Sequence, residues 1–138
     1  MNSIEKELKQ IEQIRKLRVD NFRRQQGIVA AERNQAARQI QQAEEAYQST
    51  EIELIGEQKN QLQALKSSSS VKSHEVVAYT KLQLKGVKQI KDAFNHVEDS
   101  KAKLKEVQER LNSSTVELNR AEKKLIGLQE VIKEELWE

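Results

Sequence analysis

Every seventh residue in the second half of this chain is a large aliphatic side chain. The column consists of Ile90, Val97, Leu104, Leu111, Leu118, Leu125 and Ile132. An apolar repeat of seven held over this length keeps one helix face against a partner helix, because a straight helix would drift away from any other seam. The second half is therefore expected to form one long coiled-coil helix.

The other heptad columns of the chain are weaker. Three residues after the aliphatic column lies a companion column of small and mixed side chains: Ala93, Ser100, Val107, Ser114, Ala121 and Leu128. The first half has two mixed columns: Leu8, Arg15, Phe22, Val29, Ala36, Ala43 and Thr50, and Glu12, Val19, Gln26, Arg33, Ile40, Tyr47 and Leu54. The mixed composition of these columns is explained if the first half folds back on the second, so that the columns of the two halves face each other.

An antiparallel register in which facing residue numbers add up to 140 pairs large side chains with small ones. Leu54 would then face Gly86, and Tyr47 would face Ala93. Gln26 opposite Ser114 would form one polar layer, which is a device that specifies register in coiled coils.

Four consecutive serines, residues 67–70, lie at the midpoint of this register in a chain without proline. Serine side chains compete for backbone hydrogen bonds and favour helix ends and turns. We therefore predict an all-α fold: a long two-helix antiparallel coiled-coil hairpin without a sheet. Residues 1–138 would form a single domain, with helices over about 3–66 and 74–136 and a turn at about 67–73. The alternative is an intermolecular coiled coil in which the serines are only a hinge.

Composition argues against catalysis by this chain alone. Apolar residues make up 36% and aromatic residues 4%, which is too little for a thick globular core. Cysteine is absent, and the glycines are isolated rather than grouped in a phosphate-binding loop. Asp92 and His96 share a helix face but are read as a solvated pair. No catalytic residue, metal or cofactor is expected, and the chain is not expected to be an enzyme.

Charge is zoned along the chain. Residues 14–26 concentrate five basic side chains, Arg15, Lys16, Arg18, Arg23 and Arg24, against the single acid Asp20. An acidic stretch follows with Glu44, Glu45, Glu51, Glu53 and Glu57, and a basic stripe consists of Lys81, Lys85 and Lys88. The net charge is only +2, so nucleic acid is not the expected partner.

Residues 76–90 contain more apolar side chains than one seam can bury. Val76, Val77, Tyr79, Leu82, Leu84 and Val87 all lie in this stretch. Some of them are expected to face a partner, unless the end of the first helix covers them.

The stretch LRVDNFRRQQ, followed by AERNQAARQIQQAEEAYQ, a polar turn and a second long helix, resembles the YscO/HrpO/FliJ-type stalk proteins of bacterial type III secretion and flagellar export. The resemblance covers nearly the whole chain, and the virulence branch fits better than the flagellar one. It implies a cytoplasmic stalk protein at the base of the secretion apparatus, which reaches the membrane only through its partners.

The same resemblance implies partners and sites. The paired termini would enter a hexameric export ATPase through Arg15, Lys16, Arg18, Arg23 and Arg24. The end of the hairpin near the turn would approach the cytoplasmic domain of the export gate, and could escort secretion chaperones, through Tyr79, Leu82, Gly86 and Ile90. Such a stalk is expected to be a monomer. The alternative functions are a homodimeric coiled-coil scaffold or adaptor with no ATPase partner, and a basic RNA-associated helical protein.

Overall fold

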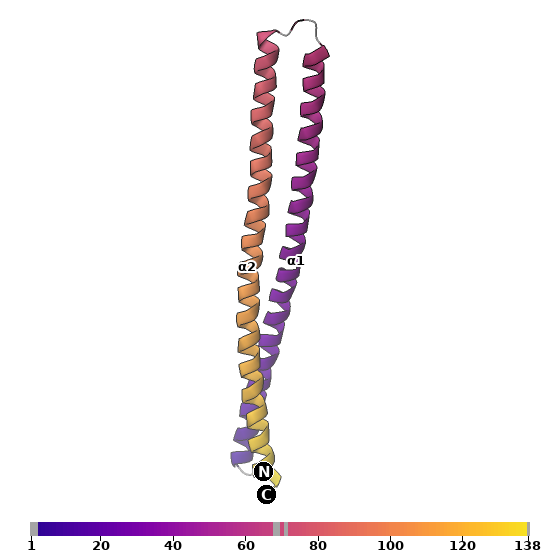
Figure 1. Ribbon diagram of the computed structural model, residues 1–138. Coiled ribbons are helices and arrows are strands. Elements are labelled where there is room, and N and C mark those ends of the chain that lie inside the picture. Colours follow the sequence, from indigo (N-terminus) through magenta and orange to yellow (C-terminus); the bar gives the residue numbers. More distant parts are fainter. Residues whose placement is uncertain (1–2, 68–69, 71, 138) are drawn as a thin grey trace. The chain divides into compact units, whose positions relative to one another are not determined.

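The computed structural model describes residues 3–67, 70 and 72–137, and nearly all of these are helical. Helix α1 spans Ser3–Ser67 and helix α2 spans Ser73–Trp137. Both sequences are rich in Ala, Gln, Glu, Lys and Leu, which are strong helix formers, and proline is absent. No strand occurs in the described ranges. The predicted all-α helical hairpin is confirmed (Figure 1).

Helix α1 ends inside the serine run, and α2 begins one residue before its expected start. The hydroxyl of Ser67 donates a hydrogen bond to the carbonyl of Ala64 at 3.2 Å, as expected of a serine that ends a helix. The backbone N–H groups of Glu75 and Val76 donate to the carbonyl of Lys72, at 3.0 and 3.3 Å, and form the first turn of α2.

The chain divides into two compact units, each built from both helices. The terminal unit comprises Met1–Gln35 and Leu104–Glu138, and the turn-proximal unit comprises Ala36–Lys103. In each unit α1 and α2 lie side by side and run in opposite directions (Figure 1).

The core of the terminal unit is one side chain thick and follows the predicted columns. Its buried residues are Val19 on α1 and Val107, Ser114, Leu118, Leu128 and Ile132 on α2. The expected polar layer is shifted by one residue. The amide of Gln26 donates to the hydroxyl of Thr115 at 3.0 Å, while the Ser114 hydroxyl is buried and has no hydrogen-bond partner among the residues that the structure describes. Arg33, although it belongs to a predicted column, is exposed and donates to Gln108 at 3.0 Å.

The turn-proximal unit confirms the predicted pairing of Leu54 with Gly86. A Cβ atom at Gly86 would lie 3.1 Å from Cδ2 of Leu54, so the leucine occupies the space that the missing side chain leaves. Tyr47 packs edge-on against Phe94, with ring centroids 6.2 Å apart, rather than only against Ala93 as expected. A tyrosine ring is long enough to reach past the residue directly opposite it, so this contact requires no change of register.

Candidate partner-binding site

A shallow hollow in the terminal unit gathers positive charge from both helices. It has a volume of about 570 Å³. We call it the basic hollow, and its lining residues are Arg15, Arg18 and Phe22 from α1 and Glu117, Arg120, Ala121 and Lys124 from α2. Four cationic side chains therefore surround one carboxylate, in a chain whose total charge is only +2.

Helix spacing explains why these side chains converge. Arg15, Arg18 and Phe22 are separated by three and four residues, so they share one face of α1. Glu117, Arg120, Ala121 and Lys124 repeat the same spacing on α2. The two faces meet because Phe22 and Ala121 are half-buried members of the heptad columns.

Arg15 joins the two walls of the hollow. Its Nη1 donates a hydrogen bond to the backbone carbonyl of Lys124 at 2.9 Å. The rest of its planar guanidinium still carries N–H donors and the full positive charge. Arg15 is thereby held in place while remaining able to attract an anion.

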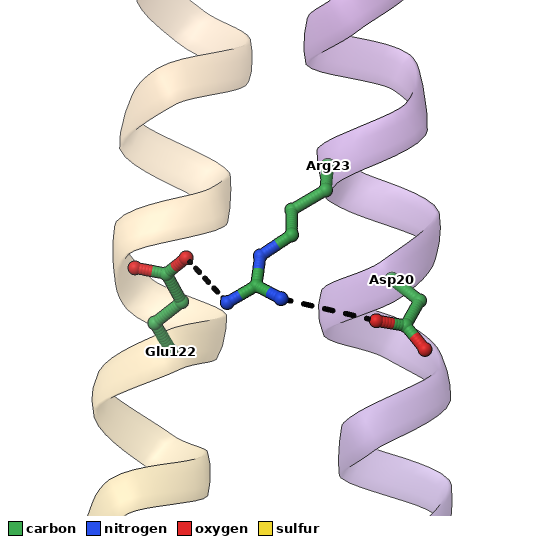
Figure 2. Close-up of polar contacts among 3 residues, drawn as sticks. All are labelled: Asp20, Arg23 and Glu122. Atoms are coloured by element: carbon green, nitrogen blue, oxygen red, sulfur yellow. Dashed lines mark hydrogen bonds and ion pairs between the residues drawn. The ribbon is translucent and has the colours of Figure 1, made fainter.

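The other members of the predicted basic cluster lie outside the basic hollow. Figure 2 shows Arg23 between two carboxylates, with Nη2 at 3.4 Å from Oε1 of Glu122 and Nη1 at 4.0 Å from Oδ1 of Asp20. Lys16 pairs with Glu12, one turn away on α1, at 3.0 Å. These ion pairs lie at the surface, with Glu12 and Glu122 partly exposed and the other partners exposed, so each stabilises the fold by no more than about 1 kcal/mol. They do, however, place counter-charges beside two of the five predicted cations.

Arg18 and Arg24 form no hydrogen bond or ion pair with any residue that the structure describes, and the same holds for Arg120. Of these three, Arg18 and Arg120 line the basic hollow, whereas Arg24 does not. Sequence reasoning overlooked Arg120 and Lys124, because they are separated from the first cluster along the chain. The predicted antiparallel register could have identified them, because it places Arg120 level with about residue 20 and Lys124 level with about residue 16, beside the basic cluster of the first helix.

The chemistry available to the basic hollow is anion recognition. Guanidinium groups form short, charge-assisted hydrogen bonds with carboxylates, often two at a time, and remain charged at any physiological pH. Phe22 adds an apolar floor against which the methylene part of an acidic side chain could pack. The hollow therefore suits an acidic protein surface.

The four residues predicted to contact the gate or chaperones lie in the turn-proximal unit. Tyr79 and Leu82 line a groove of about 370 Å³ together with Gln61, Ala64, Leu65, Glu75 and Ala78. The Tyr79 hydroxyl accepts a hydrogen bond from Gln83 at 2.8 Å. Gly86 is buried against Leu54, and Ile90 is half-buried. The structure thus brings Tyr79 and Leu82 together at a groove and places Gly86 and Ile90 within the contact between the helices.

Within the described part of the chain, no cluster of three or more His, Cys, Asp or Glu side chains could hold a metal ion. A search of the same residues finds neither helix apolar enough, over a sufficient length, to cross a bilayer.

Antiparallel helical hairpins serve proteins of unrelated function, so the fold alone assigns none. No family model matches this chain, and no curated protein or solved structure does so either.

Proposed function

We propose that this chain is a non-enzymatic stalk of a bacterial type III export apparatus. In this proposal the terminal unit enters the central pore of the hexameric export ATPase, and the turn-proximal unit reaches the cytoplasmic domain of the export gate. The chain would work in the cytoplasm at the base of the apparatus and could also escort secretion chaperones.

The observation that carries this proposal is the basic hollow. A stalk held in a ring needs a site that both helices build, because a contact made by one helix alone would not require the hairpin. Arg15 and Arg18 on one wall and Arg120 and Lys124 on the other meet this requirement. Acidic loops in the pore would be the complementary partner, since Arg–carboxylate contacts combine charge with fixed geometry.

Two further features support the same proposal. The stretch LRVDNFRRQQ that carries the family resemblance contains Arg18 and Phe22 of the basic hollow. The groove lined by Tyr79 and Leu82 gives the turn-proximal unit a surface that a gate domain or a chaperone could contact.

The test is ATP hydrolysis by the cognate export ATPase, measured with and without the purified chain, together with the mass of the ATPase assembly. The proposal expects faster turnover and a hexamer that carries one copy of this chain. A failure to form any complex, with an unchanged rate of hydrolysis, would contradict it.

A homodimeric scaffold without an ATPase partner is the second candidate. It is favoured by the turn-proximal unit, where Ile52, Leu84 and Val87 are all more than half exposed. The mass of the free chain in solution separates the two candidates, because a hairpin stalk is expected to be a monomer and a scaffold a dimer or larger. Binding to the ATPase is the second measurement that distinguishes them.

A further inference from the structure

A second hollow adjoins the basic hollow in the terminal unit. It has a volume of about 560 Å³. We call it the acidic hollow, and its walls include Ile28 and Val29 from α1 and Glu106, Glu109, Arg110 and Glu117 from α2. Glu117 also lines the basic hollow, so the two hollows share a wall.

The acidic hollow carries a net negative charge. The cation in its wall, Arg110, is already paired with Glu32 at 2.9 Å. Glu106, Glu109 and Glu117 are exposed and form no ion pair or hydrogen bond with any residue that the structure describes. The acidic hollow therefore attracts cations, whereas the basic hollow with its four cationic side chains attracts anions.

A buried hydroxyl is a second indication that the acidic hollow receives a polar group. Ser114 lines this hollow and is only 8% exposed, and its hydroxyl has no hydrogen-bond partner within the described part of the chain. An unsatisfied buried hydroxyl costs free energy that a bound donor would recover. Lysine and arginine side chains donate hydrogen bonds and carry positive charge, so they would suit both this hydroxyl and the carboxylates.

The two hollows form one continuous face of the terminal unit. On α1, steps of three and four residues lead from Arg15 in the basic hollow to Val29 in the acidic hollow, through residues 18, 22 and 25. On α2, the same steps lead from Glu106 to Lys124, through residues 110, 113, 117 and 120. Residues spaced in this way share one side of a helix. Both hollows therefore open on the same side of the helix pair.

Apolar side chains accompany the two charged sites. Ile28 in the acidic hollow is 61% exposed, and Phe22 in the basic hollow is half-buried. The middles of the two hollows are about nine residues apart along α2, which corresponds to about 14 Å. A face of this length with apolar side chains and steps of three and four residues matches one side of an amphipathic helix.

We propose that this face binds one helix of a partner protein, which carries acidic side chains at one end and basic side chains two to three turns away. The acidic end would lie in the basic hollow, and the basic end would lie in the acidic hollow. Apolar side chains of the partner would cover Ile28 and Phe22, so that three helices pack together as in a coiled coil. The direction of the bound helix would be fixed, because the reverse direction brings like charges together.

Charge complementarity selects this partner over a nucleic acid or a membrane. Phosphates and anionic lipids would be attracted to the basic hollow, but the carboxylates of the acidic hollow would repel them. A helix that carries both signs meets opposite charge in both hollows. The inference rests on the proposed function and deepens it, since it adds a basic end to the acidic segment that the basic hollow would bind.

Three labelled peptides probe this face on the full chain, with binding measured by fluorescence anisotropy at low salt. Each peptide is an amphipathic helix of about 20 residues with the same apolar positions. The bipolar peptide carries glutamates at one end and lysines at the other, the second peptide carries glutamates throughout, and the third carries lysines throughout. The bipolar peptide should bind at least about tenfold more tightly than either of the others, because only it meets opposite charge in both hollows.

Glu106→Lys with Glu109→Lys should exchange this preference. These substitutions make the acidic hollow basic, so the all-glutamate peptide should then bind more tightly than the bipolar peptide. Glu51→Lys with Glu53→Lys is the matched control, because it makes the same change in net charge at exposed positions of the turn-proximal unit. This control should keep the preference for the bipolar peptide.

A pair of variants without charge keeps the test valid if the lysine substitutions disturb folding, which circular dichroism would reveal. Ile28→Gln should weaken binding of the bipolar peptide, whereas Ile126→Gln should not. Both isoleucines are more than half exposed and belong to the terminal unit, but Ile126 lies outside the two hollows. Equal effects of the two substitutions would contradict the proposed face.

The proposal is wrong if the wild-type chain binds the all-glutamate peptide as tightly as the bipolar peptide, or if Glu106→Lys with Glu109→Lys keeps the wild-type preference. It is also wrong if the free chain has twice its 16.0 kDa mass and this variant is a monomer, because the face would then bind a second copy. A chain that prefers the bipolar peptide but does not accelerate the export ATPase would contradict the stalk function alone. A chain that accelerates the ATPase but prefers the all-glutamate peptide would contradict this inference alone.

Discussion

The terminal and turn-proximal units both pair α1 with α2, but they do so through different kinds of contact. In the terminal unit, polar side chains cross from one helix to the other: Arg15 to the Lys124 carbonyl, Arg23 to Glu122, Gln26 to Thr115, Arg33 to Gln108 and Arg110 to Glu32. In the turn-proximal unit, the contacts that identify the register are the packing of Leu54 on Gly86 and of Tyr47 on Phe94.

This difference shows that contacts which select the register of the two helices need not be the contacts that stabilise the fold most. Exposed polar contacts across a two-helix seam stabilise it only weakly, but each is satisfied in one register, so they help to select the pairing. A leucine that fills the space beside a glycine both buries apolar surface and fits in one register only, so it stabilises the pairing and selects it. Packing therefore fixes the register of the turn-proximal unit at the level of Leu54 and Gly86.

The largest effect is expected from Leu54→Ala. Removing the buried side chain that fills the space at Gly86 should lower the free energy of unfolding by about 2–4 kcal/mol, through lost apolar contact and the cavity left behind. Ile52→Ala, two residues away and mostly exposed, should change it by less than about 0.5 kcal/mol. Urea titrations followed by circular dichroism would measure both, and equal losses would show that Leu54 is not a core residue.

Arg18→Glu combined with Arg120→Glu tests whether the basic hollow binds the export ATPase. The double reversal should weaken binding at least tenfold, which corresponds to about 1.4 kcal/mol, because it reverses one cation on each wall of the hollow. Lys103→Glu with Lys105→Glu makes the same change in net charge at exposed positions outside the hollow and is the matched control. Titration of labelled chain into the ATPase gives the affinities. If both pairs of substitutions weakened binding equally, the effect would come from net charge rather than from the basic hollow.

Two serines that are equally buried, one in each unit, provide a matched comparison of polar burial. Ser114 and Ser100 are both 8% exposed, but within the described part of the chain only the Ser100 hydroxyl has a hydrogen-bond partner, since it donates to the His96 carbonyl at 2.8 Å. Ser114→Ala should raise stability by about 1 kcal/mol, because it removes an unsatisfied hydroxyl and improves helix propensity. Ser100→Ala should raise it by less. Thermal unfolding of the two variants measures the difference, and a larger gain at Ser100 would contradict this account.

The smallest effects are expected at the glycines. Gly27→Ala and Gly127→Ala introduce a methyl group that meets no atom within 4 Å beyond the neighbouring backbone of its own helix, so each should stabilise its helix by about 0.5–1 kcal/mol. Gly86→Ala should gain less, because Leu54 must move to admit the new Cβ. Melting temperatures of the three variants would rank them, and an equal gain at Gly86 would mean that Leu54 adapts without cost.

Much of the fold could be predicted from the residues themselves. The column from Ile90 to Ile132 required a long helix with one partner seam, and the serine run marked where the chain could turn. The pairing of Leu54 with Gly86 followed from matching a large residue with the smallest one. Such features are periodic or local, so they can be read along the chain without coordinates.

The candidate site was predicted only in part, because a binding surface depends on which side chains neutralise one another. Five basic residues formed a cluster in sequence, but Arg23 and Lys16 lie beside carboxylates, while Arg15 and Arg18 join Arg120 and Lys124. Likewise, the partner of Gln26 was misplaced by one residue, since the reach of a side chain across the seam depends on its rotamer.

By itself, the sequence of this protein determined its helices, their antiparallel pairing and its zones of charge, because heptad spacing and residue size act along the chain. The tertiary structure decided which charges are shared, which remain unpaired and which aliphatic side chains stay in water. Those properties depend on how two helix faces are rotated toward each other, and a difference of one residue turns a side chain by about 100°.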